Sequence, residues 1–169
     1  MTSNADRAFR NAMGRFATGV TIITAAAQDG QPVGMTMNSF SSVSLDPPLI
    51  QFSVGKTAFG IEVYRTAKGL AVNILGQDQE ALSTRFARPS VDKWDGVRYA
   101  PGYEGAPLIE RTLARIECAP WAIYEGGDHL IFVCRVVRFS QHADRPPLLF
   151  YGGRYVGLAA DPAPTGEPA

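Results

Sequence analysis

The sequence predicts a mainly β fold, a small closed barrel with a few helices packed outside it. About seven or eight short apolar or β-branched runs, separated by turn residues, are spread along the 169-residue chain. The chain has 17 Gly and 12 Pro, which suits many short strands joined by turns. The strand-like runs do not alternate regularly with helices, and no G-x-G-x-x-G fingerprint is present, so a doubly wound parallel sheet is not expected.

Composition indicates one globular domain, and we expect it to span residues 1–158. A hydrophobic share of 46% and a charged share of 19% are ordinary for such a domain. A formal net charge of zero argues against a nucleic-acid partner. The tail 159–169 is rich in Pro and Ala and is expected to be disordered.

The expected location is the cytoplasm. No apolar run is long enough to span a membrane, and the N-terminus lacks the pattern of a secretory signal. Cys118 and Cys134 lie in apolar, strand-like runs without Cys or His neighbours, so we expect two reduced core thiols and no metal site.

The first element is an amphipathic helix over residues 4–17. Its apolar residues recur at helical spacing, and Asn4 or Ser3 can cap it. We expect it to pack on an apolar surface. Strands are expected at 19–26 and 33–37, joined by a turn at 29–32.

The stretch 34–54 is the most informative part of the chain. A segment dense in hydroxyls, 36–42, stands between apolar runs, and a strand at 49–54 follows the pair Pro47-Pro48. Because polar groups beside a core are costly unless satisfied, this segment predicts the edge of a ligand site.

Gly55-Lys56-Thr57 resembles the end of a phosphate-binding P-loop, but that pattern requires Gly at position 50, which is Ile50. The triplet still precedes a helix expected over 58–67, which Thr57 could cap. Backbone N–H groups, a hydroxyl and an ammonium would converge there, which is compatible with a monophosphate site. A capped helix with a solvated lysine remains the alternative.

The second half of the chain continues the β pattern. The expected elements are a strand at 69–75, a helix at 77–87, an irregular loop at 88–105, a hairpin of strands at 113–124 and 130–139, and a strand at 148–151.

Few residues suggest acid or base chemistry. His129 follows a Gly-rich turn and opens a strand, where it could face a cleft or simply hydrogen-bond to Asp128. No nucleophile elbow or paired carboxylates are present, so an organic cofactor is expected to carry any chemistry.

An ordered set of short motifs resembles the flavin reductase-like family, whose members have an FMN-binding Greek-key split β-barrel. The motifs are GMTMNSF (34–40), SLDPPL (44–49), AVNIL (71–75) with Gln79, RFA (85–87), GAPL (105–108), GDH (127–129) and LLFY (148–151). The resemblance covers about residues 9–158 of the chain. Trp94 is a departure, since many relatives carry Phe there.

This resemblance implies the site residues. Thr36, Asn38, Ser39 and Ser42 would meet the flavin ring and ribityl chain, and Ser53, Lys56 and Thr57 would hold its phosphate. Arg85, Phe86 and Lys93 would wall the flavin, either within one chain or from the partner subunit. The implied cofactor-binding set is Thr36, Met37, Asn38, Ser39, Ser42, Ser53, Lys56, Thr57, Arg85, Phe86, Lys93 and Trp94. His129, as the catalytic residue, and Tyr151 would face the nicotinamide.

The activity implied by the resemblance is that of an NAD(P)H:flavin oxidoreductase (EC 1.5.1 type). NADH or NADPH would pass a hydride to FMN or FAD, and a homodimer would supply reduced flavin to a partner monooxygenase. Two alternatives remain open: a flavin-binding or electron-carrier protein without enzymatic activity, and a purely structural barrel.

Overall fold

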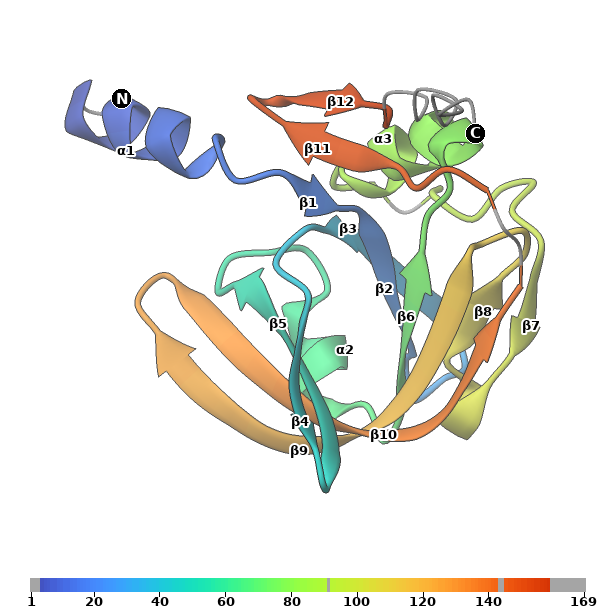
Figure 1. Ribbon diagram of the computed structural model, residues 1–169. Helices are drawn as coiled ribbons and strands as arrows, with labels where there is room; N and C mark the ends of the chain where they lie inside the picture. The colour runs from blue at the N-terminus through green and yellow to red at the C-terminus, as the bar shows by residue number, and fades with distance from the viewer. Residues whose placement is uncertain (1–3, 91, 143–144, 159–169) are drawn as a thin grey trace, which may run out of the picture.

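Residues 4–90, 92–142 and 145–158 are described by a computed structural model of the chain, and their fold is mainly β (Figure 1). An antiparallel seven-stranded sheet forms the body of the molecule. In spatial order its strands are β3 (Pro32–Met37), β2 (Thr21–Ala26), β6 (Leu70–Ile74), β9 (Ala114–Gly126), β10 (His129–Gln141), β5 (Pro48–Gly55) and β4 (Ser41–Leu45). Ser3, a candidate cap of the first helix, and the tail 159–169 lie outside the described residues.

The strongly curved sheet is not closed into a barrel. β3 and β4 lie at its two edges, and neither pairs with a further strand among the described residues. The prediction of a mainly β fold is therefore confirmed, whereas the predicted closure is not.

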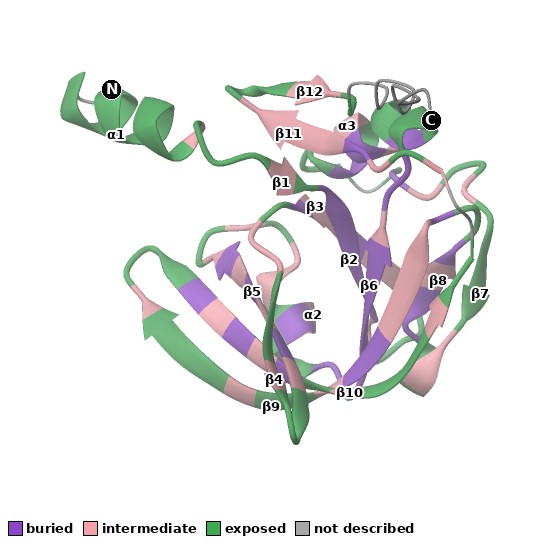
Figure 2. Ribbon diagram, viewed as in Figure 1, coloured by how far each residue is buried: buried purple, intermediate pink, exposed green. Residues whose placement is uncertain are grey.

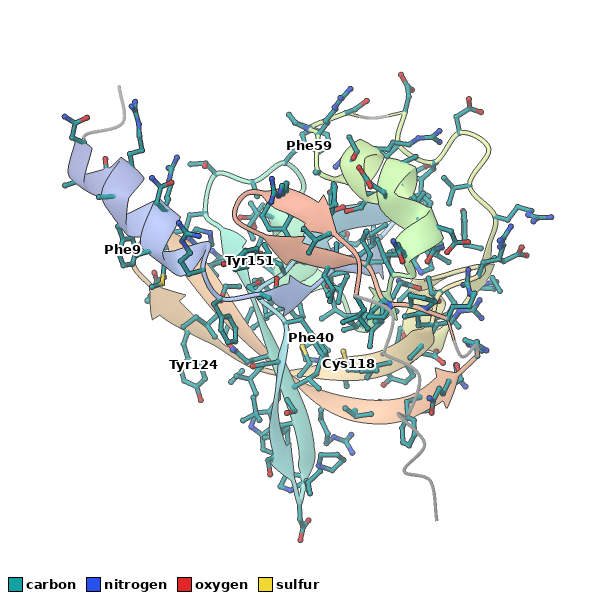
Figure 3. The ribbon with its side chains drawn as sticks, turned by 45° about the horizontal axis from the view of Figure 1, so that its top comes forward. Phe9, Phe40, Phe59, Cys118, Tyr124 and Tyr151 are labelled. Atoms are coloured by element: carbon teal, nitrogen blue, oxygen red, sulfur yellow. The ribbon has the colours of Figure 1, made fainter. Side chains whose placement is uncertain are left out.

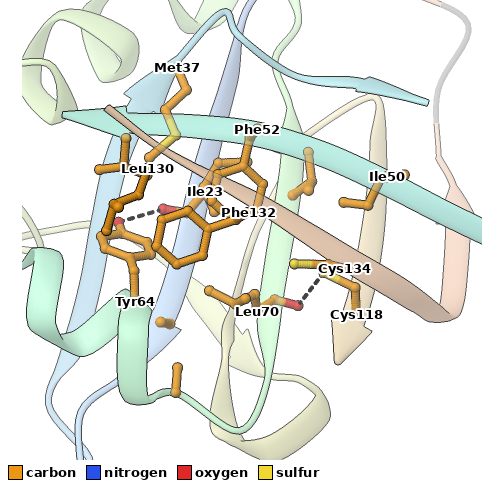
Figure 4. Close-up of a cluster of buried hydrophobic side chains, with 14 residues drawn as sticks. Ile23, Met37, Ile50, Phe52, Tyr64, Leu70, Cys118, Leu130, Phe132 and Cys134 are labelled. Carbon is orange, nitrogen blue, oxygen red and sulfur yellow. Dashed lines mark hydrogen bonds between the residues drawn. The ribbon is translucent and has the colours of Figure 1, made fainter. Parts of the chain in front are cut away.

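The concave side of the sheet holds the main apolar core, with α2 (Ile61–Thr66) inside the curve (Figures 1 and 4). Phe52 of β5 and Phe132 of β10 are cross-strand partners whose rings stack with centroids 5.2 Å apart. Tyr64 of α2 is buried, and its hydroxyl donates to the Ile23 carbonyl (3.0 Å). Burial raises the pKa of Tyr64, so the phenol stays neutral.

The two cysteines are free and belong to this core. Cys118 of β9 and Cys134 of β10 are both fully buried (Figure 4). The hydrogen bond with Cys134, together with burial, raises the pKa of the Cys118 thiol. The expectation of two reduced core thiols is confirmed.

A second layer lies at one end of the sheet. It contains α3 (Glu80–Phe86), with the short turn Gln77–Gln79 before it, and the small sheet β1 (Thr18–Gly19), β11 (Leu149–Tyr151) and β12 (Arg154–Val156). Phe86 is fully buried there in a second apolar cluster. The segment expected to be an irregular loop contains β7 (Tyr99–Pro101) and the turn Tyr103–Gly105, and β7 pairs with β8 (Pro107–Ile109).

Two buried polar side chains connect the segment from β7 to β8 to the large sheet. The Asn73 amide oxygen accepts from the Ile109 N–H (2.8 Å), and its amide nitrogen donates to the Ile22 carbonyl (3.1 Å). The Glu117 carboxylate accepts from the Tyr103 N–H and from Arg138. Both residues are nearly inaccessible, so these bonds are shielded from water.

The first helix, α1 (Asn4–Met13), extends away from the body and buries none of its residues (Figure 2). Phe9, Met13 and Phe16, on and just after this helix, are 65%, 58% and 77% exposed. One backbone bond, from the Gly152 N–H to the Gly14 carbonyl (2.8 Å), ties the end of the helix to the β11–β12 turn. The apolar surface on which this helix was expected to pack is therefore not provided by the described part of the chain.

α2 begins later than expected. It starts at Ile61 after Gly60, which adopts φ 80° and has no side chain with which to cap. Thr57 is therefore not the cap of this helix, and the phosphate-site argument from a capped N-terminus is corrected. A positive φ at this position favours glycine, which explains why the helix begins here.

No helix within the described ranges combines the length and the apolar character needed to cross a bilayer.

Candidate functional site

One hydroxyl ties the loop after β3 to β5. Ser39 Oγ accepts a hydrogen bond from the Ser53 N–H (2.9 Å) and donates one to the Ser53 carbonyl (3.0 Å). β4 pairs with β5 only as far as Ser41 opposite Gln51. Ser39 thus provides the next partner for the β5 backbone and fixes the loop that carries Asn38.

Two other hydroxyls of this segment also have partners inside the protein. Thr36 Oγ1 donates to the Ser83 carbonyl of α3 (2.7 Å), and Ser41 Oγ accepts from the Gln51 amide (2.9 Å). The hydroxyl-rich segment therefore does not require a ligand as expected, because hydrogen bonds within the fold satisfy much of it.

The rest of the predicted segment is divided between the core and the surface. Met37 is only 6% exposed and belongs to the main core, so it has little side-chain surface for a ligand. Asn38 and Ser42 are exposed. Asn38 is the better placed of the two, since it lines a cleft together with Ser39.

The end of β5 and the start of β10 lie side by side. His129 pairs with Gly55, and the Lys56 N–H donates to the Asp128 carbonyl (2.9 Å). The Lys56 ammonium forms an ion pair with the carboxylate of Glu125 at the end of β9. The predicted phosphate residues and the predicted catalytic histidine are therefore joined by backbone pairing, with Thr57 exposed beside them.

His129 is half exposed and is oriented by its neighbour. Its Nδ1 lies 2.7 Å from Asp128 Oδ1. This hydrogen bond to His129, with a smaller contribution from the charge of Arg10, lowers the pKa of Asp128, so the carboxylate stays ionised. Its Nε2 lies close to Gly55: a Cβ atom added at Gly55 would lie 3.8 Å from Nε2.

A cleft of about 1290 Å³ opens between α1, the loop 38–39 and the β11–β12 turn. Figure 3 shows the molecule turned toward this end, with Phe9 on α1 and Tyr151 on β11 labelled. The lining combines aromatic rings with positive charge: Phe9, Phe16, Phe150 and Tyr151 with Arg10, Arg15 and Arg154. An aromatic and cationic cleft of this kind suits a flat, anionic ligand.

A second group of predicted residues lies elsewhere, around α3 and β3. The Lys93 ammonium donates to the carbonyls of Gly34 (3.3 Å) and Phe86 (3.2 Å), and burial lowers its pKa. Phe86 is fully buried, with its ring 4.9 Å from that of Trp94. Arg85 is exposed and donates to the Asp95 carbonyl (2.7 Å).

These contacts correct the expectation for two residues. Phe86 and Lys93 are buried against the outside of β3, so their side chains are not available to wall a flavin in this chain. Instead, both side chains pack against β3 and stabilise it. Trp94 is partly exposed and packs between the rings of Phe86 and Tyr99.

Two residues of the site were not identified from the sequence. Arg10 lies in the cleft and near Asp128, and Glu125 pairs with Lys56. The hydrogen bond between Asp128 and His129 was one of the two alternatives for His129. The predicted hairpin could have suggested Glu125, because the same turn carries His129. Nothing in the sequence indicated Arg10, whose neighbours are distant along the chain.

No group of three or more His, Cys, Asp or Glu side chains in the described residues gathers as a metal site would require.

Comparisons with known proteins identify the family of the chain. Residues 13–159 match the flavin reductase like domain family. The chain is 45% identical over 149 residues to "FMN reductase (NADH) SmoA" of Agrobacterium fabrum, covering 88% of this chain and 84% of that protein. It is 38% identical to the "Flavin-dependent monooxygenase, reductase subunit HsaB" of Rhodococcus jostii, covering 94% and 82%.

The solved structures include a similar fold. The Streptomyces globisporus NADH:FAD oxidoreductase SgcE6, in complex with NAD and FAD fragments, has a TM-score of 0.87 and 42% identity, covering 95% of this chain and 98% of that one. With the family match over most of its length, the chain belongs to the flavin reductase-like domain family.

Proposed function

We propose that the protein is an NADH:flavin oxidoreductase that reduces FMN or FAD and supplies the reduced flavin to a partner flavin-dependent monooxygenase. The observation that carries this proposal is the convergence of separate segments at one end of the sheet. Asn38 and Ser39, Lys56 and Thr57, and His129 come from three parts of the chain and are connected there by hydrogen bonds or strand pairing. Similar proteins are named FMN or FAD reductases and reductase subunits of monooxygenases.

The two ligands of such a reaction would occupy the cleft and reach beyond its lining to Lys56, Thr57 and His129, which do not line it. Ligand pockets usually measure roughly 300 to 1,000 Å³, so about 1290 Å³ leaves room for a flavin ring and a nicotinamide together. The aromatic side chains offer flat surfaces for stacking, and the arginines offer positive charge to the phosphates of a dinucleotide.

Each residue would have a limited role. Bound flavin would supply the hydride-accepting ring, which no side chain can replace. Ser39, held by Ser53, would keep Asn38 at the ring edge, and Lys56 with Thr57 would bind the phosphate. His129, oriented by Asp128, would present Nε2 to the nicotinamide, and Tyr151, which lines the cleft, would face the nicotinamide as well. Reaction rate would depend on how well the two rings are aligned.

The assembly would be a homodimer. α1 carries an exposed apolar face, including Phe9 and Met13, that a second copy of the chain would cover. The donor would be NADH, with NADPH as the second donor to test. A reducing compartment such as the cytoplasm suits the two free thiols.

The test is anaerobic mixing of the protein with NADH or NADPH and with FMN or FAD. Loss of the visible flavin absorbance, at a rate proportional to protein concentration, is expected. Absence of bleaching with every pairing would overturn the proposal. Flavin that stays bound and is reduced only by a protein donor would indicate an electron carrier instead.

A further inference from the structure

Lys56, the cation proposed to bind flavin phosphate, already has an anionic partner. Its ammonium forms an ion pair with the Glu125 carboxylate. Glu125 lies on β9, two strands away from Lys56 in the order β9–β10–β5, so the two side chains meet across the start of β10. Their contact therefore spans the strand end that carries His129.

The backbone on both sides of this pair is fixed, but the side chains are not. The Lys56 N–H is bonded to the Asp128 carbonyl, and Glu125 is held opposite Leu130 in the hairpin. The side chains of Lys56 and Glu125 are 41% and 74% exposed. Exchange of the carboxylate for another anion at Lys56 would thus require no movement of the sheet.

We propose that Glu125 competes with the flavin phosphate for Lys56 and thereby lowers the affinity of the protein for phosphorylated flavin. The inference rests on the proposed function, since it assigns a second role at the same phosphate position. A phosphate carries up to two negative charges and would be attracted to Lys56. It would also have to break the ion pair and then remain close to the displaced carboxylate.

The consequence is a flavin site of moderate affinity. A reductase that supplies a separate oxygenase must release its reduced flavin, and a nearby negative charge favours release. Since both groups are exposed and screened by solvent, the effect is modest. Exposed pairs of this kind contribute about 0.2 to 1 kcal/mol, which corresponds to about 1.4- to 5-fold in a dissociation constant.

The experiment compares FMN with riboflavin, which has the same ring and ribityl chain but no phosphate. Dissociation constants are measured from flavin fluorescence at low salt, without nicotinamide. The Glu125→Gln variant should bind FMN about 2- to 5-fold more tightly, with riboflavin affinity unchanged. Glu125→Asp, which keeps the charge, should remain close to the unsubstituted protein.

Two further variants isolate the cause. In a Lys56→Gln background, Glu125→Gln should give a much smaller gain for FMN, because the contested cation is absent. Glu62→Gln removes the same charge from an exposed pair with Arg65 on α2, and it should leave both affinities unchanged.

The possible outcomes separate the two proposals. Unchanged or weaker FMN binding in Glu125→Gln would overturn the competition, as would an equal gain for riboflavin or an equal gain from Glu62→Gln. In those cases flavin binding and NADH-dependent bleaching would persist, and the reductase function would stand. Failure of every variant and of the unsubstituted protein to bind either flavin would overturn both.

Discussion

The Glu117 carboxylate and the Arg138 guanidinium form two hydrogen bonds, from Nε (2.6 Å) and Nη2 (2.8 Å), across the β9–β10 pair. Glu117 is buried and Arg138 is largely exposed. The hydrogen bonds from Arg138 lower the pKa of Glu117 against the opposing effect of burial. The pair fixes the long hairpin whose other end carries His129.

This relationship predicts an acid-sensitive contribution to stability. Because the pKa of Glu117 is lower in the folded than in the unfolded chain, the stabilisation is present above the ordinary pKa of a glutamate. It is lost as the pH falls through the folded-state value. Glu117→Gln should therefore lower stability by about 1 to 2 kcal/mol at neutral pH and by less in acid. Thermal unfolding across pH checks this, and an equal loss at every pH would contradict it.

His129→Ala should slow flavin reduction while sparing flavin binding. The half-exposed imidazole is oriented by Asp128, and its loss would leave the nicotinamide less well aligned. We expect a roughly 10- to 100-fold fall in kcat/KM for NADH, with the flavin dissociation constant changed little. His142→Ala, which removes the other, exposed histidine, is the control. Equal losses in both quantities would contradict the assigned role.

Ser39→Ala should loosen the loop that carries Asn38. It removes both hydrogen bonds to Ser53 and leaves the Ser53 backbone without this partner. We expect a loss of about 1 to 2 kcal/mol in unfolding free energy and weaker flavin binding. Ser42→Ala, at an exposed position of β4, serves as the comparison. If it had the same effect, the Ser39 bridge would not be the cause.

Gly34→Ala should destabilise the protein by overpacking. An added Cβ would lie 2.6 Å from the ring of Phe86 and 3.0 Å from that of Trp94. We expect about 1 to 3 kcal/mol in chemical denaturation. Gly19→Ala is the matched control, since an added Cβ there meets nothing within 4 Å. A Gly34→Ala protein as stable as that control would show that the rings can move aside.

Phe9→Glu should disrupt the proposed homodimer. It places a charge in the exposed apolar face of α1 without touching any buried residue of the chain. Sedimentation should show a dimer for the unsubstituted protein and a shift toward monomer for the variant, with the far-ultraviolet spectrum retained. A monomer in both cases would contradict the assembly, and Gln28→Glu, which adds one negative charge at an exposed turn position, controls for the added charge.

Local patterns were sufficient to predict much of the fold. In β5 the buried residues Ile50, Phe52 and Val54 alternate with less buried ones, as the sequence pattern indicated. The hairpin with His129 at its turn was likewise predictable from its glycines. Closure was not, because it depends on whether the edge strands β3 and β4 meet.

Long-range contacts explain the errors in the candidate site. Lys93 was expected to wall the flavin, but its ammonium donates to a carbonyl 59 residues away in the chain, at Gly34. The start of α2 depended on the positive φ of Gly60, which local spacing around Thr57 did not indicate. Pairing of Lys56 with Glu125 arises only from the strand order.

The Lys93 contact also bears on the edge of the open sheet. Edge strands with free backbone groups are templates for adding strands from other molecules. On β3, the Gly34 carbonyl already accepts a hydrogen bond from the Lys93 ammonium, and Lys93 is only 5% exposed. An incoming strand would have to displace this buried cation, so the side chain protects the edge against aggregation where the chain does not close on itself.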